Sequence, residues 1–323
     1  MGRLPRARGL VARHITLLCA LALLLATAGC GGQRQLHIAL HPWIGYETLT
    51  LAADLDWLPP SVVLQRGASV SDSLQALREG RVQAAAVTLD EALRLCAELP
   101  SLQVVLVMDE SAGADALVAN PAIEDLAALA GRRVAYEDSA VTKLLLHGAL
   151  ARAGLLPGDI EGVDLTVDRH LPAYREGRID ASVSYQPHTQ DLLAAGAVRL
   201  FDSRDLPGMI LDVLVVDSRA LGRRRALLRQ VVAAHFRALR YLRSSPDDAV
   251  YRIAGYQGRS AAAIRRALEG ARLPGVEAVR ELLAGSAAVA GAVERFGELG
   301  IIAQSPALGE FLNADFLPPP APP

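Results

Sequence analysis

Short apolar runs alternate with helical stretches along most of this chain, and that alternation limits the fold more than any other feature. The strand-like runs lie at 36–40, 62–65, 82–87, 102–108, 116–119, 133–136, 163–167 and 179–185. The helical patterns between them lie at 72–79, 89–99, 141–153 and around Ala173. Strands that alternate with helices favour parallel sheets covered by helices. We therefore predict an α/β fold.

A short string of residues occurs twice, as Arg78-Glu79-Gly80-Arg81-Val82 and as Arg175-Glu176-Gly177-Arg178-Ile179. Each copy ends a helical pattern with Gly and begins an apolar strand, and glycine suits the left-handed turn that ends a helix. Common residues can also recur by chance. If the match is structural, it predicts two similar α/β lobes in which Thr88 corresponds to Tyr185. Both residues follow strands at their carboxyl ends, where open α/β sheets place ligands.

Beyond Met209 the pattern becomes mostly helical. A strand-like run at 210–216 precedes a long helical pattern at 219–243, and further helical segments lie at 248–254, 261–268, 276–283 and 287–299. The tail at 316–323 is rich in proline, so we expect it to be extended and mobile.

The N-terminus resembles an export signal. Four Arg precede an apolar run at 15–28 that is too short to span a bilayer comfortably, and Gly29-Cys30 follows it. Thr27-Ala28-Gly29-Cys30 also resembles a bacterial lipobox, although Leu is preferred where Thr27 stands. We expect a lipoprotein signal peptide at 1–29, lipidation at Cys30 and a tether at 30–35. The alternatives are an uncleaved anchor or an ordinary export signal, and both also place the domain outside the cytoplasm.

Charge and cysteine content exclude several classes of protein. Without the four arginines of the signal, 29 of the 33 basic residues remain against 35 acidic ones. A mildly acidic protein lacks the basic footprint of nucleic-acid binding. Beyond Cys30 the sequence contains only Cys96, and His37 and His41 would lie roughly 13 Å apart on a strand, too far to share a metal. We expect no metal, no cofactor and, without a recognisable acid/base or nucleophile motif, no catalytic site.

The stretch His41-Pro42-Trp43-Ile44-Gly45-Tyr46-Glu47 contains two large aromatics directly after the first strand. Because the chain has 2 Trp and 4% aromatic residues, this pair indicates a ligand platform. Packing of Trp43 at the edge of the core is the alternative interpretation.

Two predicted helix N-termini could present free N–H groups to a ligand. One includes Ser69 and Ser71, where Asp72 and Gln75 also have the spacing of a capping pair. The other includes Ser139, Val141 and Thr142, and it is the better candidate for an anion cradle although Glu137 and Asp138 precede it. Thr88 and Glu91 also have capping-box spacing, so Thr88 could be structural.

Several stretches together resemble the periplasmic substrate-binding proteins of the nitrate/sulfonate/taurine class of ABC importers, which includes the NMT1/THI5-like pyrimidine-precursor binders. The matching stretches are 43–47, 76–82, 109–116, 126–135, 185–187 and 206–216. They follow one another in order over nearly the whole mature chain. The sequence departs from the pattern at Tyr185-Gln186-Pro187, where such proteins often have Trp-Glu-Pro, so the resemblance does not name the ligand.

The resemblance implies a type II periplasmic-binding-protein fold, with two Rossmann-like lobes joined by two crossing strands. Lobe 1 would comprise 36–116 plus 213–315 and lobe 2 would comprise 117–212, with crossings at 116–118 and 210–212. Ligand would be held between the lobes as they close. The implied site residues are Trp43, Tyr46, Ser69, Ser71, Thr88, Ser111, Asp115, Ser139, Val141, Thr142, Tyr185, Gln186 and Asp212.

The acids at matched positions, Asp115, Asp212 and Glu47, affect the expected ligand. If they face the cleft, an amine or a polyhydroxylated ligand is favoured over nitrate or a sulfonate, because an unpaired buried carboxylate is costly. Alternatively, Asp115 and Asp212 brace the hinge.

The function implied is that of a monomeric, membrane-anchored solute-binding protein that delivers a small polar molecule to an ABC permease and its ATPase. One alternative is an enzyme of the pyrimidine- or menaquinone-precursor type on the same fold. The other is a ligand-sensing partner of a membrane receptor.

Overall fold

The computed structural model of the protein describes residues 35–320. Contacts divide the chain after Gln35, and the architecture below is that of the unit from Leu36 onward. The expected signal at 1–29, the lipidation site Cys30 and all but the last residue of the tether lie outside the described residues. Within 35–320, no helix combines the length and the apolar character needed to cross a bilayer.

Six strands form the larger sheet, in the order β11-β4-β10-β3-β1-β2. β1 pairs in parallel with β2 and β3, whereas β10 is antiparallel to β3 and β4. Every residue of β3 is buried and most are alanine, so helices can pack closely on both faces of the sheet. The strands are β1 (Leu36–Leu40), β2 (Val62–Arg66), β3 (Ala84–Thr88), β4 (Leu102–Ser111), β10 (Leu211–Asp217) and β11 (Ala271–Arg272).

Five strands form the smaller sheet, in the order β7-β6-β8-β5-β9. β6 is parallel to β7 and β8, whereas β5 is antiparallel to β8 and β9. The strands are β5 (Ala116–Ala119), β6 (Arg133–Tyr136), β7 (Glu161–Asp164), β8 (Ala181–Ser184) and β9 (Val198–Asp202).

The two sheets repeat one arrangement. The order β2-β1-β3-β10-β4 of the larger sheet matches β7-β6-β8-β5-β9 of the smaller one in both sequence of pairing and strand direction. Gly80 and Gly177 occupy the same place in each, with φ of 68° and 64°, directly after the helices that lead into β3 and β8. The repeated string therefore marks a structural repeat, and the predicted two-lobed α/β fold is confirmed.

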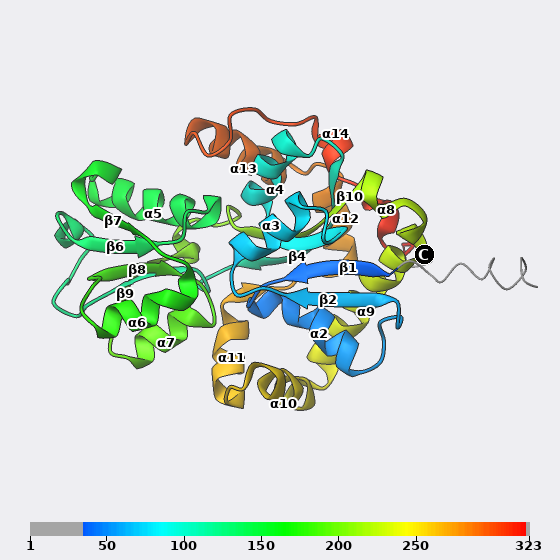
Figure 1. The fold of residues 1–323 in the computed structure, drawn as a ribbon, viewed down its shortest axis with the longest axis horizontal. Helices are drawn as coiled ribbons and strands as arrows, with labels where there is room; N and C mark the ends of the chain where they lie inside the picture. The colour runs from blue at the N-terminus through cyan, green and yellow to red at the C-terminus, as the bar shows by residue number, and fades with distance from the viewer. Residues whose placement is uncertain (1–34, 321–323) are drawn as a thin grey trace, which may run out of the picture. The chain divides into compact units, whose positions relative to one another are not determined.

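Helices cover both faces of each sheet (Figure 1). α3 and α4 lie on one face of the larger sheet and α2 and α9 on the other, while α5 lies opposite α6 and α7 on the smaller sheet. We refer to each sheet with its helices as a lobe. The helices are α2 (Glu47–Asp54), α3 (Val70–Arg78), α4 (Leu89–Glu98), α5 (Ala140–Ala153), α6 (His170–Arg175), α7 (His188–Ala194), α8 (Ser218–Leu221), α9 (Arg225–Ser244), α10 (Pro246–Gln257), α11 (Ala261–Glu269), α12 (Val276–Leu283), α13 (Ala287–Glu298) and α14 (Leu308–Phe311).

The chain passes between the sheets twice, after β4 and after β9. The expected crossings at 116–118 and 210–212 lie mostly inside strands, because β5 begins at Ala116 and β10 begins at Leu211. The connections themselves are residues 112–115 and 203–210. Asp115 therefore lies in a connection, whereas Asp212 belongs to the larger sheet.

Two predicted features of the C-terminal part are wrong. The long helix expected at 219–243 is broken, because Gly222 has a φ of 51° between α8 and α9. The tail is not mobile from its first residue, because the buried ring of Phe316 lies under the guanidinium groups of Arg225 and Arg229, at 4.7 and 5.7 Å. Arg280 also donates to the carbonyl of Pro318.

Candidate functional site

A small cavity lies where side chains of the two lobes meet. Its volume of about 10 Å³ is room for roughly one water molecule, so a larger ligand requires the lobes or the lining side chains to move. The larger lobe and its connection contribute most of the lining, and the smaller lobe contributes Val141 and Tyr185. The lining residues are His41, Trp43, Val70, Thr88, Asp115, Val141, Tyr185 and Asp212.

Four aromatic rings form a closed circuit, and three of them, those of His41, Trp43 and Tyr185, line the cavity. Ring centroids are 5.1 Å apart for His41 and Tyr46, 6.5 Å for Tyr46 and Trp43, 6.2 Å for Trp43 and Tyr185, and 5.9 Å for Tyr185 and His41. All four side chains are buried. Three rings follow β1 and the fourth follows β8, so this aromatic box is complete only when the lobes are together.

Three buried carboxyl groups stand beside the aromatic box. Asp109 of β4 accepts from the indole N–H of Trp43, at 3.2 and 3.0 Å, and Asp212 of β10 accepts from the hydroxyl of Tyr46. A Cβ on residue 45 would lie 1.7 Å from Asp109 Oδ2, so Gly45 is needed for this approach. The third carboxyl, Asp115, is 4% exposed, and its Oδ2 is buried with no hydrogen-bond partner.

Burial raises the pKa values of these carboxyls, because a charged carboxylate loses its hydration. The pKa of Asp109 and that of Asp115 are each raised to about 7, and the pKa of Asp212 is raised well above its usual value. Repulsion among the three acids adds to the effect of burial. The pKa of Asp90, close by at the start of α4, is raised to about 6, again chiefly by burial.

His41 contributes a neutral ring to the box. Burial lowers its pKa to about 3, with a further contribution from His188. Its Nδ1 lies 3.3 Å from the hydroxyl of Ser73. The box therefore combines apolar faces with carboxyls and contains no imidazolium.

Two carboxylates reach from one lobe into the other at helix N-termini. Glu137 of the smaller lobe accepts from the backbone N–H and the hydroxyl of Ser71, at the start of α3. Glu91 of α4 accepts from the backbone N–H of Ala140, at the start of α5. We call these two contacts the carboxylate latches. Each one satisfies backbone donors that the first turn of a helix leaves free.

A bidentate ion pair also joins the lobes. Arg259, between α10 and α11, donates to both carboxylate oxygens of Asp191 on α7, at 2.7 and 2.6 Å. Bidentate pairs of this kind fix geometry as well as adding attraction.

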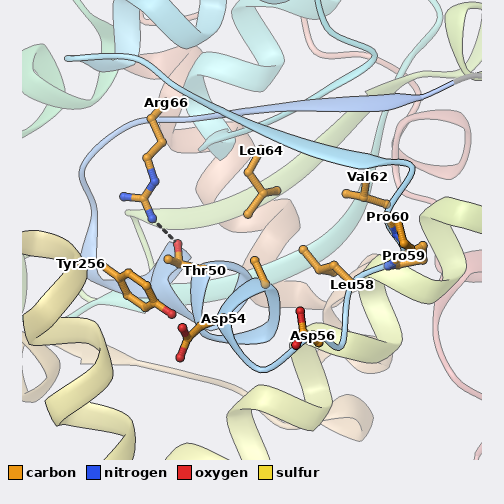
Figure 2. A pocket seen from close by; sticks show the side chains of 11 residues that line it. Thr50, Asp54, Asp56, Leu58, Pro59, Pro60, Val62, Leu64, Arg66 and Tyr256 are labelled. Atoms are coloured by element: carbon orange, nitrogen blue, oxygen red, sulfur yellow. Dashed lines mark hydrogen bonds between the residues drawn. The ribbon is translucent and has the colours of Figure 1, made fainter.

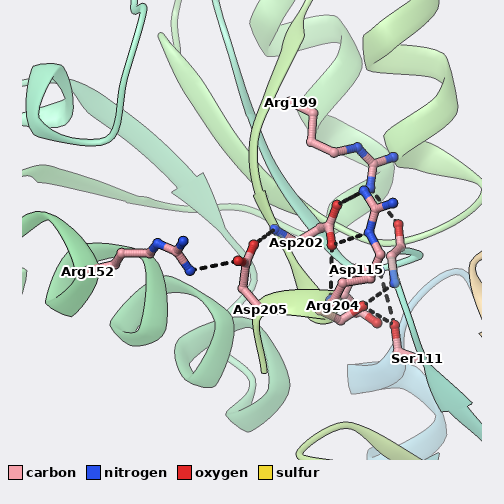
Figure 3. A network of polar contacts seen from close by, with 9 residues as sticks. Ser111, Asp115, Arg152, Arg199, Asp202, Arg204 and Asp205 are labelled. Atoms are coloured by element: carbon pink, nitrogen blue, oxygen red, sulfur yellow. Dashed lines mark hydrogen bonds and ion pairs between the residues drawn. The ribbon is translucent and has the colours of Figure 1, made fainter. Parts of the chain in front are cut away.

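The connections between the lobes are held by a separate polar network (Figure 3). Asp202 accepts from Arg199 and Arg204, and the hydroxyl groups of Ser111 and Ser203 are 2.7 Å apart. The backbone N–H of Asp115 donates to Ser111 at 3.2 Å, which holds Asp115 by its main chain. The nearby arginines are thus committed to Asp202.

The structure brings some of the predicted site residues to the cavity and places others elsewhere. Trp43, Thr88, Asp115, Val141, Tyr185 and Asp212 line it, and Tyr46 completes the aromatic box. Ser69 and Ser139 are the N-cap residues of α3 and α5. Ser111 belongs to the polar network at the connections, and Ser71 donates to Glu137 in one of the latches. Thr142 donates to the carbonyl of Glu137, and Gln186 is buried outside the lining.

Sequence reasoning missed His41 and Val70 at the cavity and Asp109 beside the aromatic box. His41 was considered only as a metal ligand, although it belongs to the same strand-end stretch as Trp43. Asp109 lies in a matched stretch, yet strand alternation alone does not show that its side chain crosses to Trp43. Sequence reasoning also missed the latches, in which Glu91 of α4 and Glu137, which precedes α5, bind the opposite lobe.

A larger groove lies away from the lobe junction (Figure 2). It has a volume of about 560 Å³ and is lined by Thr50, Asp54, Leu64, Arg66 and Tyr256, among others. Arg66 donates to Thr50 at 2.6 Å within it. It shares no lining residue with the cavity, and only the larger lobe forms it. Among the described residues, no group of three or more potential ligands is arranged to hold a metal.

One curated protein resembles part of this chain in sequence. A curated Escherichia coli (strain K12) protein named for binding aliphatic sulfonates is 32% identical over 108 residues, 33% of this chain and 31% of that protein. The chain therefore spans about a third of that relative's length.

Solved structures match much more of the chain. The periplasmic aliphatic sulphonate binding protein of Escherichia coli has a TM-score of 0.68 and 21% identity, over 87% of this chain and 92% of that one. The ligand-binding component of an ABC-type import system from Staphylococcus aureus has a TM-score of 0.74 and 13% identity, over 88% and 98%. A desulfurization enzyme has a TM-score of 0.61 and 17% identity, over 87% and 97%. Identities this low establish the shared fold alone.

A family model extends the match through both lobes. The model described as the NMT1-like family matches residues 30–254, which include every residue lining the cavity and both latches. This chain belongs to the NMT1-like family.

Proposed function

We propose that this protein is the extracytoplasmic solute-binding component of an ABC importer, which captures a small polar molecule between its lobes and delivers it to the permease. The observation that carries the proposal is the buried cavity to which both lobes contribute aromatic or polar side chains. Such a site is completed by closure, as expected of hinged two-lobed binding proteins. Membership of the NMT1-like family and the relatives' names support the same function.

The proposal has further parts that concern assembly and location. The protein is exported, anchored through a lipid on Cys30 and monomeric, and its partners are the permease and its ATPase. Lobe 1 comprises 36–116 plus 213–315, and lobe 2 comprises 117–212. No cofactor and no turnover are involved.

An enzyme on the same fold is the second candidate, because one structural neighbour is named as a desulfurization enzyme. The two functions differ in whether the bound molecule is released unchanged. Incubation with a binding compound, followed by recovery and mass measurement of that compound, separates them.

A thermal-shift screen of the full-length chain tests the main proposal. The compounds are nitrate, sulfonates, bicarbonate, amines and pyrimidines. A ligand present at 100 times its dissociation constant adds about 2.7 kcal/mol to the stability of the folded state. We expect one class of compounds to raise the Tm by about 5 °C.

The chain's 2 Trp provide a matched pair of variants. The stabilising compound should still act on Trp57→Phe, because Trp57 packs against Tyr241 and Arg237 outside the cavity. It should act much less on Trp43→Phe. If no small solute raises the Tm, or if the compound is converted during incubation, the transport function is wrong.

A further inference from the structure

Two helix N-termini that adjoin the cavity, those of α3 and α5, bind the protein's own acids. An anionic ligand is commonly held by such N–H groups. Here the start of α3 binds Glu137 and the start of α5 binds Glu91. Both acids come from the opposite lobe, so closing the lobes fills both positions with carboxyl groups. A sulfonate or nitrate could use these two N–H groups only by displacing a carboxyl group.

Among the described residues, the carboxyls of Asp109, Asp115 and Asp212 have no basic partner. Asp109 and Asp212 accept from neutral donors, the Trp43 indole and the Tyr46 hydroxyl. The charges that act on the cavity carboxyls come from other acids, namely Asp90, Glu110 and one another. The arginines near the connections, Arg199 of β9 and Arg204, bind Asp202 instead.

Asp115 supplies an unfilled acceptor. It lines the cavity and is only 4% exposed. Its Oδ2 has no hydrogen-bond partner among the described residues. A buried acceptor left without a donor costs free energy, and a buried carboxylate costs more. A ligand that brings both a donor and a positive charge would remove this cost.

The aromatic box favours the same kind of ligand. A cation is attracted to the faces of aromatic rings, most strongly to Trp and Tyr, and more so when water is excluded. Trp43, Tyr46 and Tyr185 provide such rings within one buried circuit, beside the carboxyls.

We propose that the solute carries a positively charged nitrogen, held by Asp115 and Asp212 and by the rings of Trp43, Tyr46 and Tyr185. This inference rests on the proposed binding function and names the class of its ligand: a protonated amine or a quaternary ammonium compound. The solute enters when the lobes separate, and the latches reform behind it.

A matched series of compounds tests the sign of the charge. Choline, ethanolamine and 2-hydroxyethanesulfonate share one hydroxyethyl skeleton and carry a quaternary ammonium, a primary ammonium and a sulfonate. The compound 3,3-dimethylbutan-1-ol is the neutral analogue of choline. Calorimetric titration into the full-length chain should detect at least one of the two cations, with an affinity at least tenfold above those of the neutral and anionic members.

Two variants connect the binding to the cavity. Asp115→Asn keeps the shape of the side chain but removes its charge, and it should weaken cation binding more than tenfold. Asp56→Asn is the matched control, because Asp56 lines the groove of Figure 2, and it should change affinity less than twofold. Asp212→Asn should weaken cation binding in the same way. This second variant keeps the test valid if Asp115→Asn fails to fold.

The outcomes separate this inference from the proposed function. Binding of the sulfonate without either cation overturns the inference and leaves the solute-binding function standing, as does unchanged cation binding by Asp115→Asn. Failure of both cations to bind, when some other compound of the broader screen does, also overturns only the inference. If no compound of either set binds, both are wrong.

Discussion

The surroundings of Asp115 disfavour its charged carboxylate. Its carboxyl is buried, one oxygen has no partner, and burial raises its pKa to about 7. Buried groups of this kind often trade stability for function. The titratable groups around it belong to four elements: Asp90 of α4, Asp109 of β4, Asp212 of β10 and Tyr185 after β8.

The stability of the ligand-free protein should therefore depend on pH through Asp115. Because its folded-state pKa exceeds the usual 3.8, its contribution to stability is fully present below pH 4 and is lost as the pH rises through about 7. Asp115→Asn should raise the Tm by several degrees at pH 8 and by much less at pH 5. Denaturation curves of both proteins at the two pH values measure this difference.

The control for that experiment is Asp56→Asn, which should leave the Tm difference between pH 5 and pH 8 unchanged. An equal Tm for Asp115→Asn and the unmodified protein at pH 8 would mean that the carboxyl is already compensated by a partner.

At this scale the sequence predicted the site only in part. Trp43, Tyr46, Asp115 and Asp212 were identifiable because scarce aromatics and matched acids mark them. Asp109 was not, because its role depends on the missing Cβ of Gly45, which lets a strand from 66 residues further along reach the indole. Contacts of this kind arise from packing between distant elements rather than from local pattern.

Among the elements, α3 and α5 contact the opposite lobe through their N-termini. Each receives a carboxylate from the other lobe, Glu137 for α3 and Glu91 for α5. The contacts form only when the lobes are together, so the latches stabilise the closed arrangement. Hydrogen bonds to a charged group contribute about 1.5–3 kcal/mol, roughly twice as much as neutral ones.

Replacing a latch carboxylate should weaken ligand binding from a distance. Glu137→Gln removes the charge but keeps an acceptor for Ser71, so we expect a loss of about 1 kcal/mol in closure. That corresponds to roughly fivefold weaker affinity, mainly through faster dissociation. Stopped-flow measurement of ligand release from the variant tests this.

Glu79→Gln serves as the comparison, because Glu79 follows the same α3 but is exposed and pairs with Arg81 within its own lobe. Equal release rates for the two variants would show that the Glu137 latch does not stabilise the closed arrangement of the lobes.

The elements themselves were largely predictable. The strands at 36–40, 116–119 and 133–136 and the helix at 276–283 have the expected bounds, since periodicity and glycine ends define them. α2 was missed because Trp43-Ile44-Gly45-Tyr46 resembles a loop, and a 3-10 turn at Ile44–Tyr46 leads directly into the helix. α7 was missed because the preceding Tyr185-Gln186-Pro187 was interpreted only as a possible ligand contact and not as the start of a helix.

For the whole molecule, the duplicated sheet order explains why the site lies at the junction. β3 of the larger sheet and β8 of the smaller one occupy equivalent positions in the two sheet orders. β3 ends at Thr88 and β8 ends just before Tyr185. The carboxyl ends of those strands therefore contribute equivalent positions from opposite sides of one cavity. The repeat could be read from the sequence, whereas the way in which the lobes contact each other could not.

The molecule also contains a competing hollow, the groove of Figure 2, which is larger than the cavity and belongs to one lobe. Size would favour that groove over the cavity as the ligand site. A ligand bound between the lobes should instead affect both lobes together, because the latches join α3 to the smaller lobe and α5 to the larger one.

Hydrogen exchange of the full-length chain, with and without the tightest-binding compound of the screen, tests this central claim most directly. We expect slower exchange at the same ligand concentration in segments from both lobes, around residues 43–47, 69–72, 139–142 and 184–188. Slowing confined to residues 50–66 and 251–259, the groove side of the larger lobe, would contradict the claim that the solute binds between the lobes.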